Sequence, residues 1–399
     1  MLTLYTAADL LTGPGCPVCR YAGETGDRYL AWFALEAHAQ AVTITRLCSS
    51  LGMCPRHTRA LMSQPGAASR LTAVYRYVME AARDRLSGRA ARLGTCPACE
   101  HNDGSAGRAL DTLLEGLTDN SVREHYRELG GLCIPHLRAA SARGDHRVVA
   151  WLSATMTATV NAWPASPGWL AGIDHDAEVR AVLRQSTPAS APPSSPVCIA
   201  CLAAGQAENG HVARILRTSD RGQPDRRLLL CTIHLSDLTV LAGQRDAAAL
   251  LAWQAGCLAA GLTRRSPNRK LGDPASWLRS RRRRADGPDG CPICLASEDA
   301  AQRAVDDFRA SLRASQPLPD RQAPLCVRHL LGLRALDPWA GHVTAHGAVE
   351  RADMLIAELN EALSKHTWAH RYETRGPEMT AWRAAAFLDG SVFCGCPPR

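Results

Sequence analysis

Cysteine pairs of the form Cys-x-x-Cys occur four times along the chain, at Cys16/Cys19, Cys96/Cys99, Cys198/Cys201 and Cys291/Cys294. Each pair is followed by a Cys-x-x-His motif, at Cys54/His57, Cys133/His136, Cys231/His234 and Cys326/His329. Between the two motifs of successive copies lie 34, 33, 29 and 31 residues. Twelve of the 16 cysteines belong to these motifs, so the pattern indicates an internal repeat.

The residue types and their spacing predict metal binding. Two residues between two cysteines let both sulfurs reach one metal from a tight turn, and a proline after the first cysteine favours that turn. A Cys and a His three positions apart on the first turn of a helix point the same way. Three thiolates and one imidazole form a closed tetrahedral set used by structural zinc.

We expect each Cys-x-x-Cys pair to share a metal with the Cys-x-x-His motif that follows it. The four predicted zinc sites, about four Zn²⁺ per chain on this ligand count, are Cys16, Cys19, Cys54 and His57; Cys96, Cys99, Cys133 and His136; Cys198, Cys201, Cys231 and His234; and Cys291, Cys294, Cys326 and His329.

Other chemistry of paired cysteines is less consistent with the sequence. Covalent haem needs a histidine directly after the second cysteine, and no copy has one. A thioredoxin-like site needs a βαβ context, whereas the flanks have helical patterns. An iron–sulfur cluster or a thiol redox protein stays open as an alternative. Since all four metal positions would be filled by protein, a non-enzymatic role is favoured over catalysis.

Helices are predicted to position these motifs. Between the first two motifs, Tyr29, Leu30, Phe33 and Ala37 recur close to helical spacing. We expect two short helices in each such segment, folding back so that the two motifs of one copy meet. Glycines two residues before Cys54 and Cys133 can end the preceding helix in a left-handed conformation. Further amphipathic helices are predicted over 349–363 and 382–388.

The fold class predicted from these patterns is mainly α, with tandem small helical modules arranged as two halves and each closed by a CCCH-type metal site. The boundaries are 1–90 for module 1, 91–185 for module 2, 197–262 for module 3 and 290–399 for module 4 with the C-terminal helices. A Pro/Ser linker over 186–196 separates the halves, and an arginine-rich linker covers 263–289.

The predicted role is a scaffold or interaction protein that engages a protein or peptide partner. The chain carries a net charge of +8, and almost all of its basic residues are arginines. The run Arg279–Arg284 could bind phosphates, so a nucleic-acid-binding zinc protein is a second alternative. No apolar run approaches the roughly 20 residues of a membrane span, and no secretory signal is evident. We therefore expect a cytoplasmic protein with reduced thiols and no membrane partner.

The chain resembles a family of uncharacterised bacterial proteins. The resemblance rests on the CPxC motif, a helical insert with acidic and aromatic residues, a Gly-x-Cys-x-x-His motif, and the tryptophan-containing ending HRYETRGPEMTAWRAAAFLDG (His370–Gly390). It implies metal ligands at Cys16, Cys19, Cys54, His57 and their counterparts in the other copies, and a helical C-terminal segment. The third copy departs from the family pattern, since no proline follows Cys198. The resemblance implies no activity.

Overall fold

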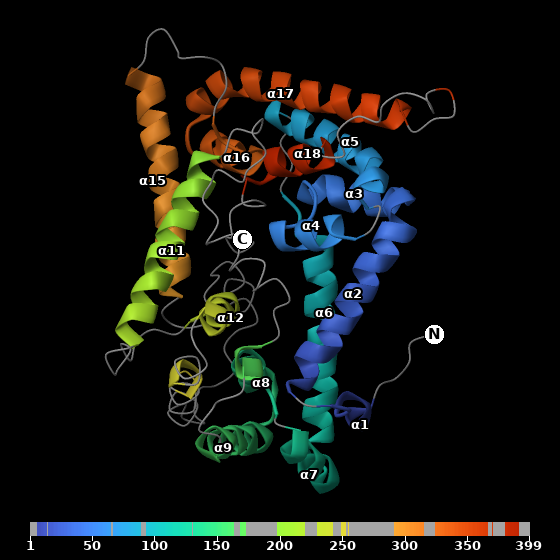
Figure 1. Ribbon diagram of the computed structural model, residues 1–399, viewed down its shortest axis with the longest axis vertical. Coiled ribbons are helices and arrows are strands. Elements are labelled where there is room, and N and C mark those ends of the chain that lie inside the picture. The colour runs from blue at the N-terminus through green and yellow to red at the C-terminus, as the bar shows by residue number, and fades with distance from the viewer. Residues whose placement is uncertain are drawn as a thin grey trace. The chain divides into compact units, whose positions relative to one another are not determined.

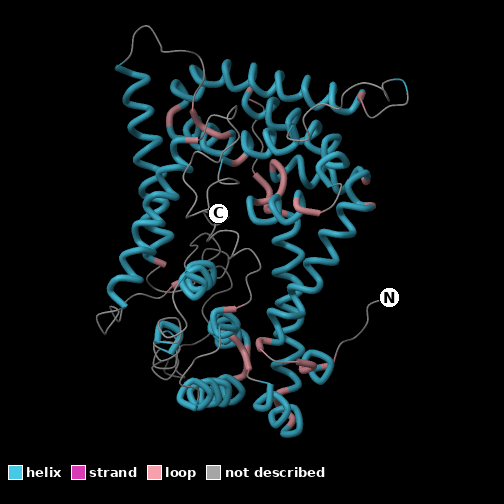
Figure 2. The backbone as a smooth tube through the Cα atoms, in the orientation of Figure 1, coloured by secondary structure: helices cyan, strands magenta, loops and turns pink. Residues whose placement is uncertain are grey.

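The chain is described here from a computed structural model. The structure describes residues 6–13, 15–64, 67–88, 93–129, 131–162, 168–172, 198–219, 230–241, 249–252, 254, 291–314, 324–365, 369 and 380–390. The regular elements in these ranges are all helices (Figures 1 and 2), which confirms the prediction of a mainly α fold. Within the described residues, no helix is long and apolar enough to cross a lipid bilayer.

A long helix begins next to every Cys-x-x-Cys motif. These helices are α2 (Pro17–Leu35), α6 (Pro97–Gly116), α11 (Ile199–Ser219) and α15 (Pro292–Ala314), with 19, 20, 21 and 23 residues. Proline is the first helical residue in three of them, where its missing N–H costs no helical hydrogen bond. At about 1.5 Å per residue, each helix carries the chain about 28–35 Å away from its cysteine pair.

A shorter helix carries every Cys-x-x-His motif. These helices are α4 (Pro55–Met62), α8 (Ile134–Arg143), α12 (Thr232–Leu241) and α16 (Val327–Leu336). The cysteine precedes the first helical residue, with an extended backbone at Cys54, Cys133 and Cys326. The histidine then lies in the first helical turn, so both side chains emerge at the helix N-terminus. This placement agrees with the predicted geometry of the motif.

The segments between the motifs hold two helices in the first two copies, as predicted, but the first helix is long. Helix α2 is followed by α3 (Ala41–Ser50), and α6 by α7 (Asn120–Leu129). The second helix has 10 residues in each case, about 15 Å. The second helix is therefore about half as long as the first. The expectation of two short helices that bring both motifs of one copy together was wrong, because the motifs of one copy lie in different groups.

The chain divides into two compact units, each assembled from three segments. Unit 1 comprises Met1–Thr25, Asn102–Ala181 and Glu208–Ala296, and unit 2 comprises Gly26–His101, Val182–Ala207 and Ser297–Arg399. Both units draw on both halves of the sequence, and their boundaries fall inside α2, α6, α11 and α15. Neither unit coincides with one of the four consecutive modules, whose boundaries stay a prediction from sequence.

Unit 1 has a hydrophobic core that includes metal-site cysteines. Leu110, Leu113 and Leu117 of α6 are buried there together with Cys16 and Cys133. Besides α7, α8 and α12, unit 1 contains α1 (Ala7–Leu10), α9 (His146–Ala162) and the 3₁₀ helix η2 (Gly168–Ala171). The ligand groups are thus part of the interior that the helices enclose.

Unit 2 has its own core, centred on α5 (Ala67–Leu86) and α17 (Pro338–Ser364). The last helix, α18 (Thr380–Leu388), packs against both. Arg383 of α18 forms a 2.7 Å ion pair with Glu358 of α17. The predicted helices over 349–363 and 382–388 are confirmed, the first as part of the much longer α17. The 3₁₀ helix η1 (Ala37–Ala39) links α2 to α3.

Candidate metal centres

The structure gathers all sixteen predicted ligand residues into four groups of three cysteines and one histidine. The potential ligand atoms of each group lie within 4.8 Å of one another. The groups are Cys16, Cys19, Cys133 and His136; Cys54, His57, Cys96 and Cys99; Cys198, Cys201, Cys326 and His329; and Cys231, His234, Cys291 and Cys294. The composition of each group is the predicted one, and each could hold a metal ion.

The pairing of the motifs differs from the prediction and is nested. Within each half of the chain, the first motif meets the fourth and the second meets the third. Cys16 and Cys19 therefore do not meet Cys54 and His57, and the other three consecutive pairings are wrong in the same way. The long helix after each Cys-x-x-Cys pair is the reason, because it carries the following Cys-x-x-His motif away from that pair.

We call the groups formed by the first and fourth motifs of a half the outer sites, and those formed by the second and third motifs the inner sites. The first outer site contains Cys16 and His136, which are 120 residues apart. The second contains Cys198 and His329, which are 131 residues apart. The two inner sites join residues only 45 and 63 positions apart.

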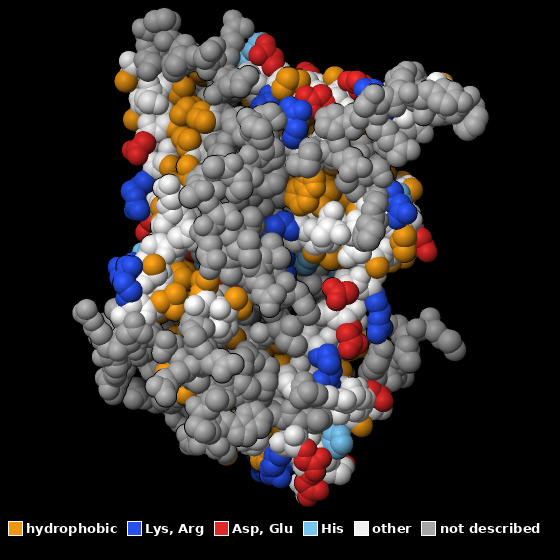
Figure 3. Space-filling model, in the orientation of Figure 1, with side chains coloured by type: hydrophobic (Ala, Val, Ile, Leu, Met, Phe, Trp, Pro, Cys, Tyr) orange, Lys and Arg blue, Asp and Glu red, His pale blue; other side chains and the backbone are white. Residues whose placement is uncertain are grey.

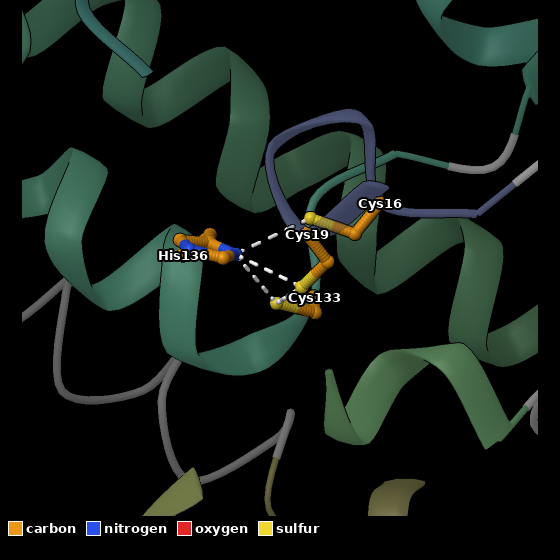
Figure 4. A group of neighbouring side chains, drawn as sticks. All are labelled: Cys16, Cys19, Cys133 and His136. Atoms are coloured by element: carbon orange, nitrogen blue, oxygen red, sulfur yellow. Dashed lines mark hydrogen bonds between the residues drawn. The ribbon is translucent and has the colours of Figure 1, made fainter. Parts of the chain in front are cut away.

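In the first outer site, three sulfurs converge on one nitrogen of the histidine ring (Figure 4). The Sγ atoms of Cys16, Cys19 and Cys133 lie 3.4, 3.2 and 3.1 Å from Nδ1 of His136. The Sγ atoms of Cys19 and Cys133 are 3.6 Å apart. One nitrogen and three sulfurs thus enclose a common centre, supplied by the start of α2 and the start of α8.

The other three sites repeat this geometry, with Nδ1 as the ring atom that faces the sulfurs. Distances from Sγ to Nδ1 are 3.2–3.6 Å at His57, 3.2–3.5 Å at His329 and 3.2–3.4 Å at His234. Sulfur–sulfur distances of 3.6, 3.9 and 3.7 Å are found in the first inner, second outer and second inner sites.

These distances fit a single tetrahedral metal ion. With metal–sulfur bonds of about 2.3 Å and metal–nitrogen bonds of about 2.0 Å, neighbouring sulfur and nitrogen ligands lie about 3.5 Å apart and two sulfurs about 3.8 Å apart. The ligand atoms of all four groups lie close to these separations. A cluster of several iron ions would hold its cysteines on different irons, which requires a wider set of ligand positions.

Burial differs between the two kinds of site. In the outer sites all three cysteines are buried, and the histidine, His136 or His329, is half-buried. In the inner sites the histidine is buried, with His57 and His234 exposing 4% and 0% of their surface. Most inner-site cysteines are half-buried, namely Cys96, Cys99, Cys231, Cys291 and Cys294. Solvent therefore reaches mainly the histidine in the outer sites and mainly the cysteines in the inner sites.

Without a metal, the cysteines of one group differ in pKa. Hydrogen bonds with Cys54 and Cys99 lower the pKa of Cys96, and hydrogen bonds with Cys201 and Cys326 lower the pKa of Cys198 to about 4. The first cysteine of the other two pairs is lowered as well, and the second cysteine is raised in all four pairs. One thiolate is thus already favoured in each group, and a metal would displace the remaining protons.

Two of the histidines acquire a raised pKa from the same contacts. Burial opposes the charged ring of His136, but hydrogen bonds that the ring donates to the sulfurs of Cys16 and Cys19 outweigh burial and raise the pKa of His136 to about 10. The same balance, with hydrogen bonds to the sulfurs of Cys231 and Cys291 and the nearby carboxyl group of Glu208, raises the pKa of His234 to about 12. Both rings respond to thiolate charge, which is the charge that a bound cation would neutralise.

Several residues that support the sites carry no motif. The backbone N–H of Leu132, next to Cys133, donates a 2.6 Å hydrogen bond to the hydroxyl oxygen of buried Tyr126. A Cβ on Gly390 would lie 2.7 Å from Cβ of Cys198, so the chain after α18 passes directly beside the second outer site. Glu208 contacts His234. The sequence offered only helical spacing for Tyr126 and no signal for the other two.

Both glycines have the predicted positive φ, although the left-handed C-cap of α3 is Leu51, with φ +54°, and Gly52 follows it. Gly52 and Gly131 have φ values of +89° and +110°. The N–H of Gly52 donates a 2.8 Å hydrogen bond to the carbonyl of Leu47, which closes the end of α3. Each glycine turns the chain into the following Cys-x-x-His motif, where a residue with a Cβ would be strained. The predicted arginine run Arg279–Arg284 lies outside the described residues.

Comparisons with protein-family models, with curated proteins and with solved structures found no match to this chain. The resemblance to a bacterial family therefore stays a hypothesis from the motifs. The geometry of the four ligand groups carries the functional argument.

Proposed function

We propose that the protein is a zinc-binding structural protein with four CCCH-type sites that acts as a scaffold for a protein or peptide partner. The observation that carries the proposal is the nested set of four Cys₃His groups, each with the spacing of one tetrahedral ion. A closed set leaves no position for a substrate or water, which favours a structural role. The metal would join segments up to 131 residues apart.

Zinc is favoured over other metals by the donor set. Three thiolates and one imidazole in a tetrahedron are common ligands of structural zinc, and Zn²⁺ imposes no geometry of its own. When bound, the ion would supply the attraction that holds three thiolates together. An iron–sulfur cluster stays the alternative, although the compact ligand spacing favours a single ion.

Metal analysis of the protein purified without added metal tests this proposal. We expect about four zinc ions per chain by native mass spectrometry and elemental analysis, on the count of ligand groups. The visible spectrum should be featureless, and replacement by Co²⁺ should give the intense bands of tetrahedral thiolate coordination. Iron with visible absorption would favour the cluster alternative, and a chain without metal would contradict both.

The partner part of the proposal rests on exposed apolar side chains in unit 2. Trp32, Leu35 and Val42 expose 41%, 62% and 72% of their surface around the end of α2 and the start of α3. Exposed aromatic and aliphatic residues close together in sequence favour recognition of apolar side chains. Among the side chains that Figure 3 colours, basic and acidic groups are interspersed, which supports a protein partner. Free thiols in all described cysteines are consistent with the cytoplasm.

Selection of peptides from a displayed library tests partner binding. Peptides enriched on the wild type should bind at least about tenfold more weakly, a loss of about 1.4 kcal/mol, to a chain with Trp32→Ala, Leu35→Ser and Val42→Ser. Tyr77→Ala, at another exposed aromatic residue of unit 2, is the control and should bind as the wild type does. Equal binding by both variants would show that this surface is not the recognition site.

A further inference from the structure

The second inner site differs from the others by a buried acidic side chain. Glu208 lies on α11 and His234 on α12, both in unit 1, and both side chains are fully buried. Oε1 of Glu208 lies 3.2 Å from Nε2 of His234. The opposite ring nitrogen, Nδ1, lies 3.2, 3.3 and 3.4 Å from the three sulfurs of the site. The ring is therefore held between a carboxyl group and three cysteines.

Burial of a carboxyl group is costly unless a partner compensates it. The Nε2 atom of an imidazole compensates best when it carries a proton that points at the carboxylate. The neutral ring can carry one proton only, so a proton on Nε2 leaves the Nδ1 lone pair free. Nδ1 is the atom that faces the sulfurs. Metal-ligating histidines commonly have such an outer partner, which fixes the protonated nitrogen and strengthens the ligand.

We propose that Glu208 is a positioning residue of the second inner site, which holds the His234 ring so that Nδ1 faces the metal. The inference rests on the proposed function, since it concerns the metal held there. It predicts that this site retains its metal more strongly than the first inner site.

The sequence supports a role confined to this site. Glu208 lies ten residues after the first cysteine of its Cys-x-x-Cys pair. The equivalent positions in the other three copies are Gly26, Ala106 and Ala301, none of which can accept a proton or carry charge. Among the four copies, only the third therefore has an acidic residue at this position.

Cadmium-113 NMR of the fully substituted protein tests the inference. The wild type should give four resonances, one for each site. Glu208→Gln keeps the size of the side chain and removes its charge, and it should shift one resonance and leave three in place. In the zinc protein, the same variant should release one metal of four to a chelator about 10–100-fold faster. Glu358→Gln, which alters a carboxylate paired with Arg383 in unit 2, is the control and should change neither readout.

The outcomes separate this inference from the proposed function. A wild type without four metals would contradict the function itself. Four metals in the wild type, with unshifted resonances and unchanged release in Glu208→Gln, would overturn the role of Glu208 alone. Glu208→Asp provides a second variant should the glutamine variant not fold, because it withdraws the carboxylate by one methylene. Faster release of one metal would support the inference, and release at the wild-type rate would overturn it.

Discussion

The outer and inner sites have the same four ligands, three cysteines and one histidine, but differ in which of them are buried. Outer sites enclose their cysteines and leave His136 and His329 half-buried, whereas inner sites enclose their histidines and leave most cysteines half-buried. Each compact unit contains one site of each kind. The ligand types thus determine which metal a site can bind. The burial of each ligand determines whether a reagent or a competing metal reaches the cysteines or the histidine first.

The two kinds of site also differ in how much chain they close. The first outer site joins residues 120 positions apart, and the first inner site joins residues 45 positions apart. Loop-closure entropy grows with the logarithm of this separation, so the outer closure costs only about 1 kcal/mol more. The larger consequence is topological, because each inner site lies in the segment that an outer site closes. Loss of an outer metal releases more of the chain than loss of an inner one.

The largest effect is expected from removal of all four metals. Structural zinc contributes about 10–16 kcal/mol to the folding of small zinc domains, which exceeds the net stability of about 5–15 kcal/mol of an ordinary domain. Both units have ligand cysteines in their cores. We expect a strong chelator to abolish cooperative thermal unfolding, as followed by circular dichroism, and zinc to restore it. An unchanged melting curve in the metal-free protein would show that the apolar cores suffice.

Single cysteine substitutions test which motifs share a metal. Cys133→Ser should lower the metal count from four to three. Alkylation followed by mass spectrometry should then find Cys16 and Cys19 newly reactive, with Cys96 and Cys99 unchanged. Cys99→Ser is the matched inner-site variant and should expose Cys54 instead. Reactive Cys96 in the Cys133→Ser chain would restore the consecutive pairing and overturn the nested one.

Sequence alone predicted which residues form the four groups but not how the motifs pair. The spacing within a motif indicates which side chains can lie on the same face of a turn or helix. This was enough to predict the cysteine pairs and the Cys-x-x-His turns. The spacing between motifs gives only the number of residues that separate them and does not indicate which motifs lie close together in the fold. The first helix of this segment, α2, has 19 residues, and nothing in the apolar pattern around Tyr29 and Phe33 distinguished a long first helix from a short one. Glu208 was missed because a single acidic residue in a helix has no periodic signal.

The outer and inner sites are also expected to lose their metals at different rates. A chromogenic chelator should take the metal of the first inner site in the fastest phase, because Cys96 and Cys99 are half-buried and no counterpart of Glu208 stands in the first copy. A difference of about 1.4 kcal/mol in the free energy of local opening would separate this phase from release by the outer sites about tenfold. Cys54→Ser removes the first inner site and should abolish only the fastest phase. First loss of metal from the sites of Cys16 or Cys198 would contradict the link between exposure and release.

The smallest effect is expected at the glycines that lead into the sites. Gly131, before an outer-site motif, has φ +110°, and a Cβ there would lie 2.9 Å from the Tyr126 hydroxyl. Gly52, before an inner-site motif, has φ +89° and only ordinary contacts near 4 Å. Gly131→Ala and Gly52→Ala should each cost at least about 1–2 kcal/mol of backbone strain, and Gly131→Ala should cost more because its Cβ also meets Tyr126.

The control for both variants is Gly332→Ala in α16, where no atom lies within 4 Å of the new Cβ. Alanine is favoured over glycine in a helix by about 1 kcal/mol, so this variant should raise the unfolding temperature while the other two lower it. Thermal unfolding of the zinc-loaded proteins measures all three. Equal losses at Gly52 and Gly131 would mean that the backbone conformation, and not the contact with Tyr126, decides the cost, and that this turn is built alike in outer and inner sites.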